Sequence, residues 1–179
     1  MDTLDRLGRH YGTDKSSDRL DYLNFYERFL APLQDRPITL LEIGVGEGRS
    51  LRMWRDYFLQ GHIIGMDIVP DKIQYKGDRI TIEIGDQADA DAIRSVAEAH
   101  GPFDVVVDDA GHVPSAQIST FITLSTYMKP GGFYILEDIM EQTTADYLLR
   151  LASIIISQGH HNVYGSISFR HLTSVIGFR

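Results

Sequence analysis

Short runs of apolar residues alternate along the chain with longer stretches in which apolar residues recur every three or four positions. The short runs are rich in Val, Ile and Leu, which is typical of strands buried on both faces of a parallel sheet. Strands that alternate with helices predict an α/β fold. The predicted strands are 39–43, 62–67, 80–85, 103–108 and 132–137.

The stretches between these runs predict helices. In the first of them, apolar residues such as Leu20, Leu23 and Tyr26 fall at helical spacing and predict one apolar face. The link 68–79 is short and contains proline and glycine, so we expect at most one helical turn there. The predicted helices are 18–30, 50–58, 89–99, 117–128 and 139–157.

The last part of the chain departs from this alternation. Two runs that resemble strands, 163–169 and 173–178, are separated by only about three residues. A parallel crossover needs about a dozen residues or more, so these runs must form an antiparallel pair. We therefore predict a doubly wound, seven-stranded α/β sheet with five parallel strands and a C-terminal antiparallel hairpin. A dinucleotide-dependent dehydrogenase would instead continue with another strand–helix–strand unit.

Composition narrows the classes of function. The chain has 179 residues, the size of one domain, and its net charge of −8 disfavours binding to nucleic-acid phosphates. It contains no cysteine, which excludes disulfides, zinc–thiolate sites and cysteine nucleophiles. The first residues show no secretory signal pattern, and no run of about 18 apolar residues occurs. We therefore expect a cytoplasmic protein whose partners include neither nucleic acid nor membrane.

The turn after the first predicted strand carries three glycines, Gly44, Gly46 and Gly48, two residues after the acidic Glu42. Glycines at this spacing let the backbone turn tightly and approach a ligand closely. Asp67 ends the second predicted strand, where a carboxylate can accept both hydroxyls of a ribose. The turn alone could serve only to reverse the chain. Together with the two acidic residues, it favours a nucleoside cofactor.

Acidic residues and a histidine follow the fourth and fifth predicted strands. Asp108 ends the fourth strand and Asp109 and His112 follow it; Glu137 ends the fifth strand and Asp138 follows it. If these strands are neighbours, the carboxylates share one edge of the sheet and repel one another, which a Mg²⁺ or Mn²⁺ ion would relieve. Two other interpretations remain open: Asp138 as the N-cap of a following helix, and His112 as an ordinary surface histidine.

The pattern E-x-G-x-G-x-G at 42–48, with a sheet that ends in an antiparallel strand, resembles the class I S-adenosylmethionine (SAM)-dependent methyltransferases. The resemblance implies that the glycines line the methionine end of SAM, that Asp67 holds the ribose and that residues 85–87 meet the adenine. The cofactor-binding residues that it implies are Tyr11, Thr13, Lys15, Glu42, Gly44, Gly46, Gly48, Ser50, Asp67, Ile68, Gly85, Asp86, Gln87 and Asp108.

Three further motifs resemble a narrower group, the metal-dependent sugar O-methyltransferases of macrolide biosynthesis of the mycinamicin and demethylmacrocin type. They are Y-G-T-D-K at 11–15, D-x-G-H at 109–112 with Gln117 after it, and G-G-x-Y-x-x-E-D at 131–138. The resemblance implies that Asp109, Glu137 and Asp138 bind Mg²⁺ (or Mn²⁺). It also implies a catalytic pair, with His112 as the general base beside Asp109.

These features together predict a SAM- and Mg²⁺-dependent O-methyltransferase. Residues 1–36 would form an N-terminal helical cap, and residues 37–179 the SAM-binding catalytic domain. By the resemblance, we expect the acceptor to be a hydroxyl of a sugar or glycosylated natural product with vicinal oxygens, and the protein to assemble as a homo-oligomer. A catechol would present the same pair of oxygens. The alternatives are an NAD(P)-dependent oxidoreductase on a Rossmann sheet and a non-catalytic SAM-binding partner protein.

Overall fold

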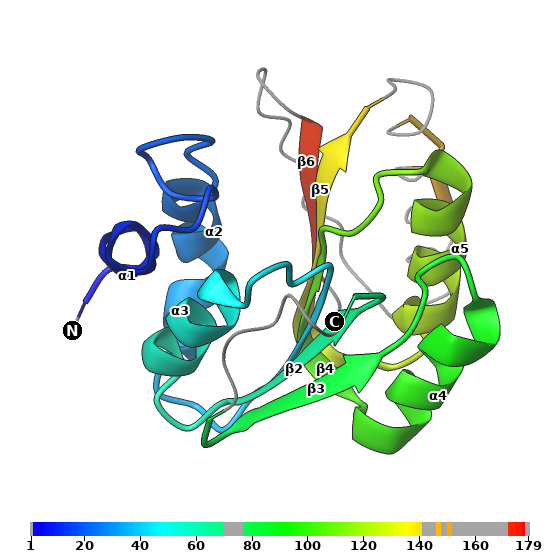
Figure 1. The fold of residues 1–179 in the computed structure, drawn as a ribbon, viewed down its shortest axis with the longest axis horizontal. Coiled ribbons are helices and arrows are strands. Elements are labelled where there is room, and N and C mark those ends of the chain that lie inside the picture. The colour runs from blue at the N-terminus through cyan, green and yellow to red at the C-terminus, as the bar shows by residue number, and fades with distance from the viewer. Residues whose placement is uncertain (1, 70–76, 141–145, 148–149, 152–171, 178–179) are drawn as a thin grey trace.

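The computed structural model describes residues 2–69, 77–140, 146–147, 150–151 and 172–177. Within them, one sheet of six strands has the order β3-β2-β1-β4-β5-β6 (Figure 1). Chain order reverses beside β1, and ligands bind at such a switch point in open α/β sheets. The strands are β1 Thr39–Ile43, β2 His62–Asp67, β3 Ile80–Ile84, β4 Phe103–Asp108, β5 Met128–Ile139 and β6 Leu172–Gly177.

The sheet confirms the predicted fold class. Strands β1 to β5 pair in parallel, and β6 pairs antiparallel with β5, with Tyr134 opposite Ile176. The described residues contain six strands where we predicted seven, because the predicted strand 163–169 lies outside them. The antiparallel last strand is therefore confirmed, and the hairpin that would lead into it stays a prediction.

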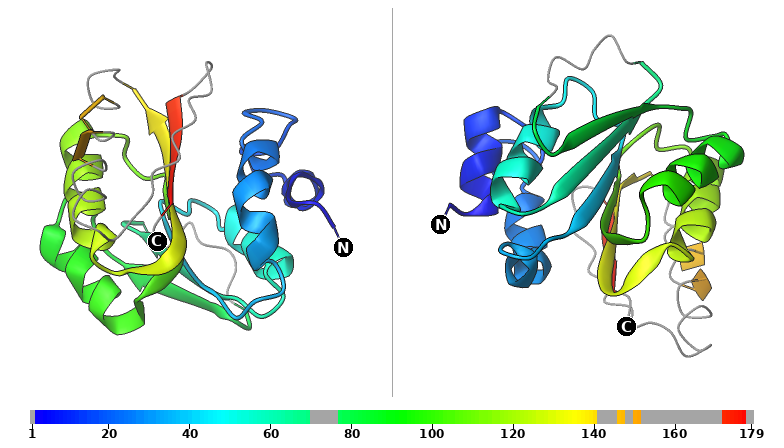
Figure 2. Two further views of the ribbon diagram at one scale, coloured as in Figure 1. Left: turned by 180° about the vertical axis from the view of Figure 1, so that it is seen from behind. Right: turned by 90° about the horizontal axis from the view of Figure 1, so that it is seen from below.

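Helices cover both faces of the sheet (Figures 1 and 2). One group of buried apolar side chains fills the space beneath α1, α2 and α3, and a second fills the space beneath α4 and α5. The sheet is therefore buried on both sides, as its apolar strands require. The helices are α1 Leu4–Tyr11, α2 Leu23–Leu30, the 3₁₀ helix η1 Ala31–Leu33, α3 Arg49–Tyr57, α4 Ala90–His100 and α5 Pro114–Ser125.

The N-terminal region differs from the prediction. We expected a helix over 18–30, but α2 begins only at Leu23, and α1 was not predicted. The carbonyl of Lys15 accepts hydrogen bonds from the backbone N–H groups of Tyr22 (2.9 Å) and Leu23 (3.2 Å). This contact folds the chain between them into turns, with Asp21 in the left-handed region at φ 58°. Helical spacing of apolar residues could not reveal this long-range closure.

Two other boundaries differ for local reasons. Helix α5 begins at Pro114, three residues before the predicted start, because proline lacks the N–H that the first turn of a helix leaves unpaired. Strand β5 continues to Ile139, which we had placed in a helix, so Asp138 lies within a strand and not at a described helix N-terminus. Most of the predicted helix 139–157 and of the link 68–79 lies outside the described residues. None of the described helices has the length and apolar character needed to span a membrane.

Candidate active site

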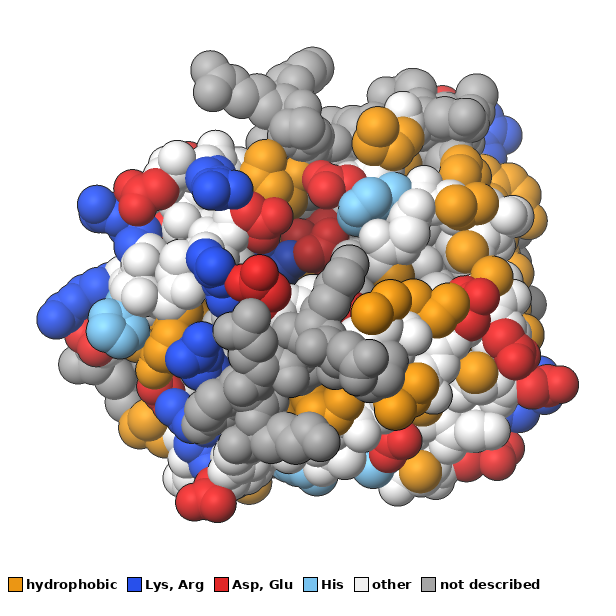
Figure 3. Space-filling view, viewed as in Figure 1, with side chains coloured by type: hydrophobic (Ala, Val, Ile, Leu, Met, Phe, Trp, Pro, Cys, Tyr) orange, Lys and Arg blue, Asp and Glu red, His pale blue; other side chains and the backbone are white. Residues whose placement is uncertain are grey.

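A cleft of about 970 Å³ lies at the carboxyl ends of the parallel strands. Figure 3 shows a hollow at the centre of the molecule, with acidic and histidine side chains gathered at its upper edge. The walls come from the turns after α1, β1, β2, β3 and β4 and from the end of β5. This is the edge of a doubly wound sheet at which ligands bind.

The glycine-rich turn brings the backbone of β1 against the loop that follows β4. Gly44 has φ 85° and Gly46 has φ 52°, conformations that other residues rarely adopt. A Cβ atom on Gly44 would overlap the carbonyl oxygen of Asp109 and lie 2.6 Å from the Cα atom of Ala110. A glycine at this position is therefore required for the two loops to touch.

Asp67 holds the glycine-rich turn in place. Its Oδ2 atom accepts hydrogen bonds from the backbone N–H groups of Val45 and Gly46, both at 3.0 Å, and its Oδ1 atom accepts one from Val69 at 2.9 Å. The carboxylate also lines the cleft. Asp67 therefore has a structural task in addition to the predicted contact with a ribose.

A buried hydrogen-bond network lies behind the predicted adenine end of the cleft. Gln87 donates from Nε2 to Oδ1 of Asp108, and its Oε1 accepts from the N–H of Gly111 at 3.4 Å. The hydroxyl of Tyr134 donates to Oδ2 of Asp108 at 2.9 Å. Burial raises the pKa of Asp108 to about 7, although both donors oppose the shift. Gln87 thus connects the loop after β3 to the loop that carries Asp109 and His112.

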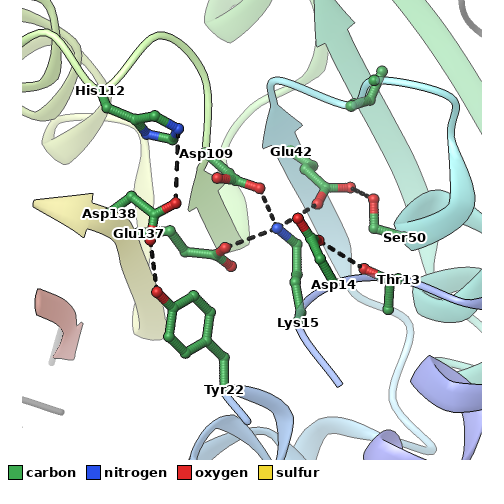
Figure 4. Close-up of polar contacts among 12 residues, drawn as sticks. Thr13, Asp14, Lys15, Tyr22, Glu42, Ser50, Asp109, His112, Glu137 and Asp138 are labelled. Carbon is green, nitrogen blue, oxygen red and sulfur yellow. Dashed lines mark hydrogen bonds and ion pairs between the residues drawn. The ribbon is translucent and has the colours of Figure 1, made fainter. Parts of the chain in front are cut away.

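Three of the predicted metal and catalytic residues converge in the cleft. Asp109, His112 and Asp138 each offer a ligand atom, and these atoms lie within 4.8 Å of one another. His112 Nε2 is 3.7 Å from Asp138 Oδ2, and Tyr22 donates from its hydroxyl to Asp138 Oδ1 at 2.6 Å (Figure 4). His112 and Asp138 have φ 53° and 50°, and such strained backbone is concentrated at functional sites.

The remaining metal candidate, Glu137, faces a buried lysine. Lys15 Nζ lies 2.7 Å from Glu137 Oε2, makes an ion pair with Asp109 Oδ2, and is 3.8 Å from Glu42 Oε1 (Figure 4). The side chains of Lys15, Glu42 and Glu137 are at most 2% exposed. Burial by itself lowers the pKa of Lys15, but the carboxylates of Glu137, Asp109 and Glu42 raise it well above its ordinary value.

The carboxylates outnumber this ammonium. Burial raises the pKa of Glu42 to about 7, against the opposing effects of Lys15 and of Ser50, which donates to Glu42 Oε2 at 2.7 Å. Burial likewise raises the pKa of Glu137 and of Asp109, although Lys15 opposes both shifts. The acidic cluster of Glu42, Asp109, Glu137 and Asp138 therefore holds more potential negative charge than one ammonium group can neutralise. A second cation would relieve the excess.

The structure brings most of the predicted cofactor-binding residues to the cleft wall. Tyr11 instead donates its hydroxyl to Asp56, Gly48 is the N-cap of α3, and Glu42 and Asp108 are buried behind the wall, where they accept hydrogen bonds from Ser50 and Gln87. Those that line the cleft are Thr13, Lys15, Gly44, Gly46, Ser50, Asp67, Ile68, Gly85, Asp86 and Gln87.

Sequence reasoning missed two residues at the site. Tyr22 contacts Asp138, and Arg19 lines the cleft with an exposed side chain. Both lie in the turns where we had predicted a helix, so no spacing rule indicated them. The fold determines their positions, because the segment after α1 folds back across the carboxyl ends of β4 and β5 (Figure 4).

Comparison with known proteins agrees with this geometry. The family described as a methyltransferase domain matches residues 17–179, so the chain belongs to that family of methyltransferases. It is 39% identical over 140 residues to 8-demethyl-8-alpha-L-rhamnosyl tetracenomycin-C 2'-O-methyltransferase of Streptomyces olivaceus, which covers 74% of this chain and 36% of that relative. It is also 36% identical over 143 residues to mycinamicin VI 2''-O-methyltransferase of Micromonospora griseorubida, covering 76% of this chain and 36% of that relative.

A solved structure extends the similarity to nearly the whole chain. It is the MycE methyltransferase from the mycinamycin biosynthetic pathway in complex with Mg, S-adenosylhomocysteine (SAH) and mycinamycin VI. The TM-score is 0.84 at 28% identity, over 99% of this chain and 54% of that one. This chain thus spans about a third of the length of the curated relatives that it matches and about half of the solved chain.

Proposed function

We propose that this protein is a SAM- and Mg²⁺-dependent O-methyltransferase that acts on a hydroxyl of a sugar or glycosylated natural product. The observation that carries the proposal is the convergence of Asp109, His112 and Asp138 within the cleft that the glycine-rich turn opens. The family match supports methyl transfer, and the names of the relatives support sugar oxygens as acceptors.

The cleft suits SAM in shape and in chemistry. Gly44 and Gly46 carry no side chain, so a ligand can approach the backbone of this turn closely. Asp67 offers a carboxylate at the end of β2, where a ribose would sit. At the far end, Gln87 and its neighbours form the wall expected to contact adenine. The mycinamycin-pathway enzyme is in complex with SAH, which supports a SAM site in this cleft.

The donor set fits a divalent cation. Asp109, Glu137 and Asp138 supply the hard carboxylate oxygens that Mg²⁺ prefers. Oε1 of Glu137 is buried and has no hydrogen-bond partner among the described residues, although the hydroxyl of Tyr26 lies close to this carboxylate. A bound Mg²⁺ would neutralise the excess negative charge and make a coordinated sugar hydroxyl more acidic.

His112 is suited to remove the proton from the acceptor. Its side chain is one-third exposed and lines the cleft, with Nε2 at 3.7 Å from Asp138 Oδ2. In the proposed reaction, the acceptor oxygen attacks the methyl carbon of SAM, the carbon–sulfur bond breaks, and the hydroxyl proton passes to His112. The products are SAH and a methyl ether. General base catalysis of this kind contributes about 10²–10⁴-fold.

Three further assignments belong to the proposal. Residues 1–36 would act as a cap, because Lys15 and Tyr22, which lie between α1 and α2, contact Asp109, Glu137 and Asp138. The expected location is the cytoplasm, in keeping with the absence of a membrane-spanning helix among the described residues. Assembly into a homo-oligomer remains a prediction.

The first test is calorimetric titration of SAH into the protein, followed by titration of Mg²⁺ into the complex. We expect one SAH site and one saturable Mg²⁺ site, and methyl transfer to a rhamnosylated or macrolide-linked sugar that stops with EDTA. Asp109→Asn should lose Mg²⁺ binding and turnover together while it still binds SAH. Turnover that persists in EDTA would refute the metal site, and a protein that binds NADH but not SAH would favour the oxidoreductase.

A further inference from the structure

Lys15 contacts only one oxygen of each of two carboxylates in the acidic cluster. Its ammonium group contacts one oxygen of Asp109, Oδ2, and one oxygen of Glu137, Oε2. The second oxygen of Glu137, Oε1, is buried and has no hydrogen-bond partner among the described residues, although the hydroxyl of Tyr26 lies close to this carboxylate. One ammonium group thus holds one oxygen of each of two carboxylates, Asp109 directly after β4 and Glu137 in the neighbouring strand β5, and does not contact their second oxygens.

We propose that Lys15 is a positioning residue for the divalent cation: it orients Asp109 and Glu137 so that their remaining oxygens can coordinate the ion together. The inference rests on the proposed function, because it assumes that the cluster binds Mg²⁺. Without the shared donor, two carboxylates from adjacent strands would repel each other and turn apart. A ligand of a metal ion is often held in this way by a partner that does not itself touch the metal.

The same segment contacts the third carboxylate of the cluster. The carbonyl of Lys15 accepts the N–H groups of Tyr22 and Leu23, and the hydroxyl of Tyr22 donates to Asp138. Residues 15–23 therefore contact Asp109, Glu137 and Asp138 at once. If these contacts orient the ligands for the ion, the ion must in turn stabilise the contacts, because coupling between two binding events is reciprocal.

The selectivity of the site between two cations distinguishes an orienting role of Lys15 from the effect of its charge alone. Removal of the lysine charge makes the cluster more negative, which favours Mg²⁺ and Ca²⁺ alike because both carry two charges. Misplaced carboxylates affect the two ions differently. Mg²⁺ demands near-ideal octahedral geometry, whereas Ca²⁺ accepts flexible sets of six to eight ligands. A positioning role therefore predicts a change in the ratio of the two dissociation constants.

The experiment measures Kd for Mg²⁺ and for Ca²⁺ by calorimetry in the presence of saturating SAH. It compares the wild type with Lys15→Met, which keeps the length of the side chain but has no donor. The matched control is Lys129→Met, because Lys129 Nζ pairs with Asp104 Oδ2 at 2.7 Å across the same two strands, at their opposite end. Changes in metal-supporting residues of this kind typically cost about 10–100-fold in affinity.

We expect Lys15→Met to reduce the preference for Mg²⁺ over Ca²⁺ about tenfold or more, and Lys129→Met to leave it unchanged. An unchanged ratio in a folded Lys15→Met variant would overturn the proposal, even if both affinities shift together. A wild type that does not prefer Mg²⁺ would also overturn it. A wild type that binds SAH but neither cation would refute the metal site of the proposed function as well, so the two failures are distinguishable.

A second measurement needs no variant and applies even if Lys15→Met does not fold. Hydrogen exchange of the backbone amides of Tyr22 and Leu23, which bond to the Lys15 carbonyl, is followed in wild-type protein with SAH, with and without Mg²⁺. We expect Mg²⁺ to slow both amides, while the amide of Ile93 in α4 exchanges at the same rate. Equal exchange of Tyr22 and Leu23 with and without saturating Mg²⁺ would contradict the coupling that the proposal requires.

Discussion

Alanine substitutions at two glycines of the same turn should have unequal effects. Gly44 and Gly46 both have positive φ, so a side chain at either position strains the backbone by about 1–2 kcal/mol. Their surroundings differ. A Cβ atom on Gly44 would overlap backbone atoms of Asp109 and Ala110, whereas a Cβ atom on Gly46 has nothing within 4 Å.

The difference between the two variants measures how tightly the loops pack. Gly46→Ala should lose only the strain term, about 1–2 kcal/mol. In Gly44→Ala, the free energy of unfolding should fall by this strain and by a further overpacking cost of about 1–3 kcal/mol, because backbone atoms cannot rotate away as a side chain can. The assay is urea unfolding of the protein without cofactor, and an unchanged slope m would show that each shift of the midpoint is a change in stability.

Gly44→Ala should also displace the loop that carries Asp109 and His112. We therefore expect weaker Mg²⁺ binding in this variant, measured with SAH at saturation, beyond what its stability explains. Gly46 lines the cleft, so the methyl group of Gly46→Ala would occupy space meant for the cofactor. This variant is therefore a control for stability and not for ligand binding. Equal losses of stability in the two variants would refute the close contact between the loops.

Three other predictions test separate parts of the site. His112→Ala should bind SAH and Mg²⁺ as the wild type does but lose about 10²–10⁴-fold in turnover, and full activity would exclude it as the base. Burial raises the pKa of Glu42 to about 7, so the folded protein holds this proton more tightly than the unfolded chain does. The wild type therefore loses stability as the pH rises from the ordinary carboxyl pKa towards 7. Glu42→Gln, which cannot ionise, should therefore gain stability relative to the wild type over this range in urea titrations at several pH values; a constant difference would refute the shift. Gln87→Leu removes a donor to buried Asp108 and should lower the free energy of unfolding in urea by about 1–3 kcal/mol. The control Gln60→Leu breaks an exposed hydrogen bond to a carbonyl and should lower it by about 0.5 kcal/mol or less. Equal losses would contradict the role of the buried network.

The parts of the fold that local patterns determine were predictable from the sequence. Apolar runs located β1 to β4 within a residue, because strands buried on both faces leave a nearly continuous apolar signal. The antiparallel β6 agrees with the predicted C-terminal antiparallel strand, but its pairing with 163–169, to which the short spacing applied, lies outside the described residues. The prediction that Asp109 and Asp138 share one edge of the sheet depended on β4 and β5 being neighbours, which the strand order confirms.

What the sequence could not reveal depends on contacts between distant residues. Lys15 was expected at the cofactor, but its ammonium group lies among carboxylates up to 122 positions away, and no local pattern encodes that meeting. Tyr22 reaches Asp138 for the same reason. Helix α1 was missed because it is short, and its stability comes from packing Leu4 and Leu7 into the core. Asp138 proved to be part of β5, so its alternative interpretation as a helix cap finds no support.

The acidic cluster is costly to the fold, and that cost favours a functional explanation. Glu42, Asp109 and Glu137 are drawn out of water around a single ammonium group. Breaking a buried ion pair is destabilising, yet apolar side chains of similar volume can replace such a pair at little or no cost, so stability alone gives no reason to keep these carboxylates. Strongly perturbed acids in a cleft are typical of functional sites. A site that must attract a divalent cation needs negative charge in excess of what its own lysine neutralises, and the same lysine can keep the carboxylates in order until the cation arrives.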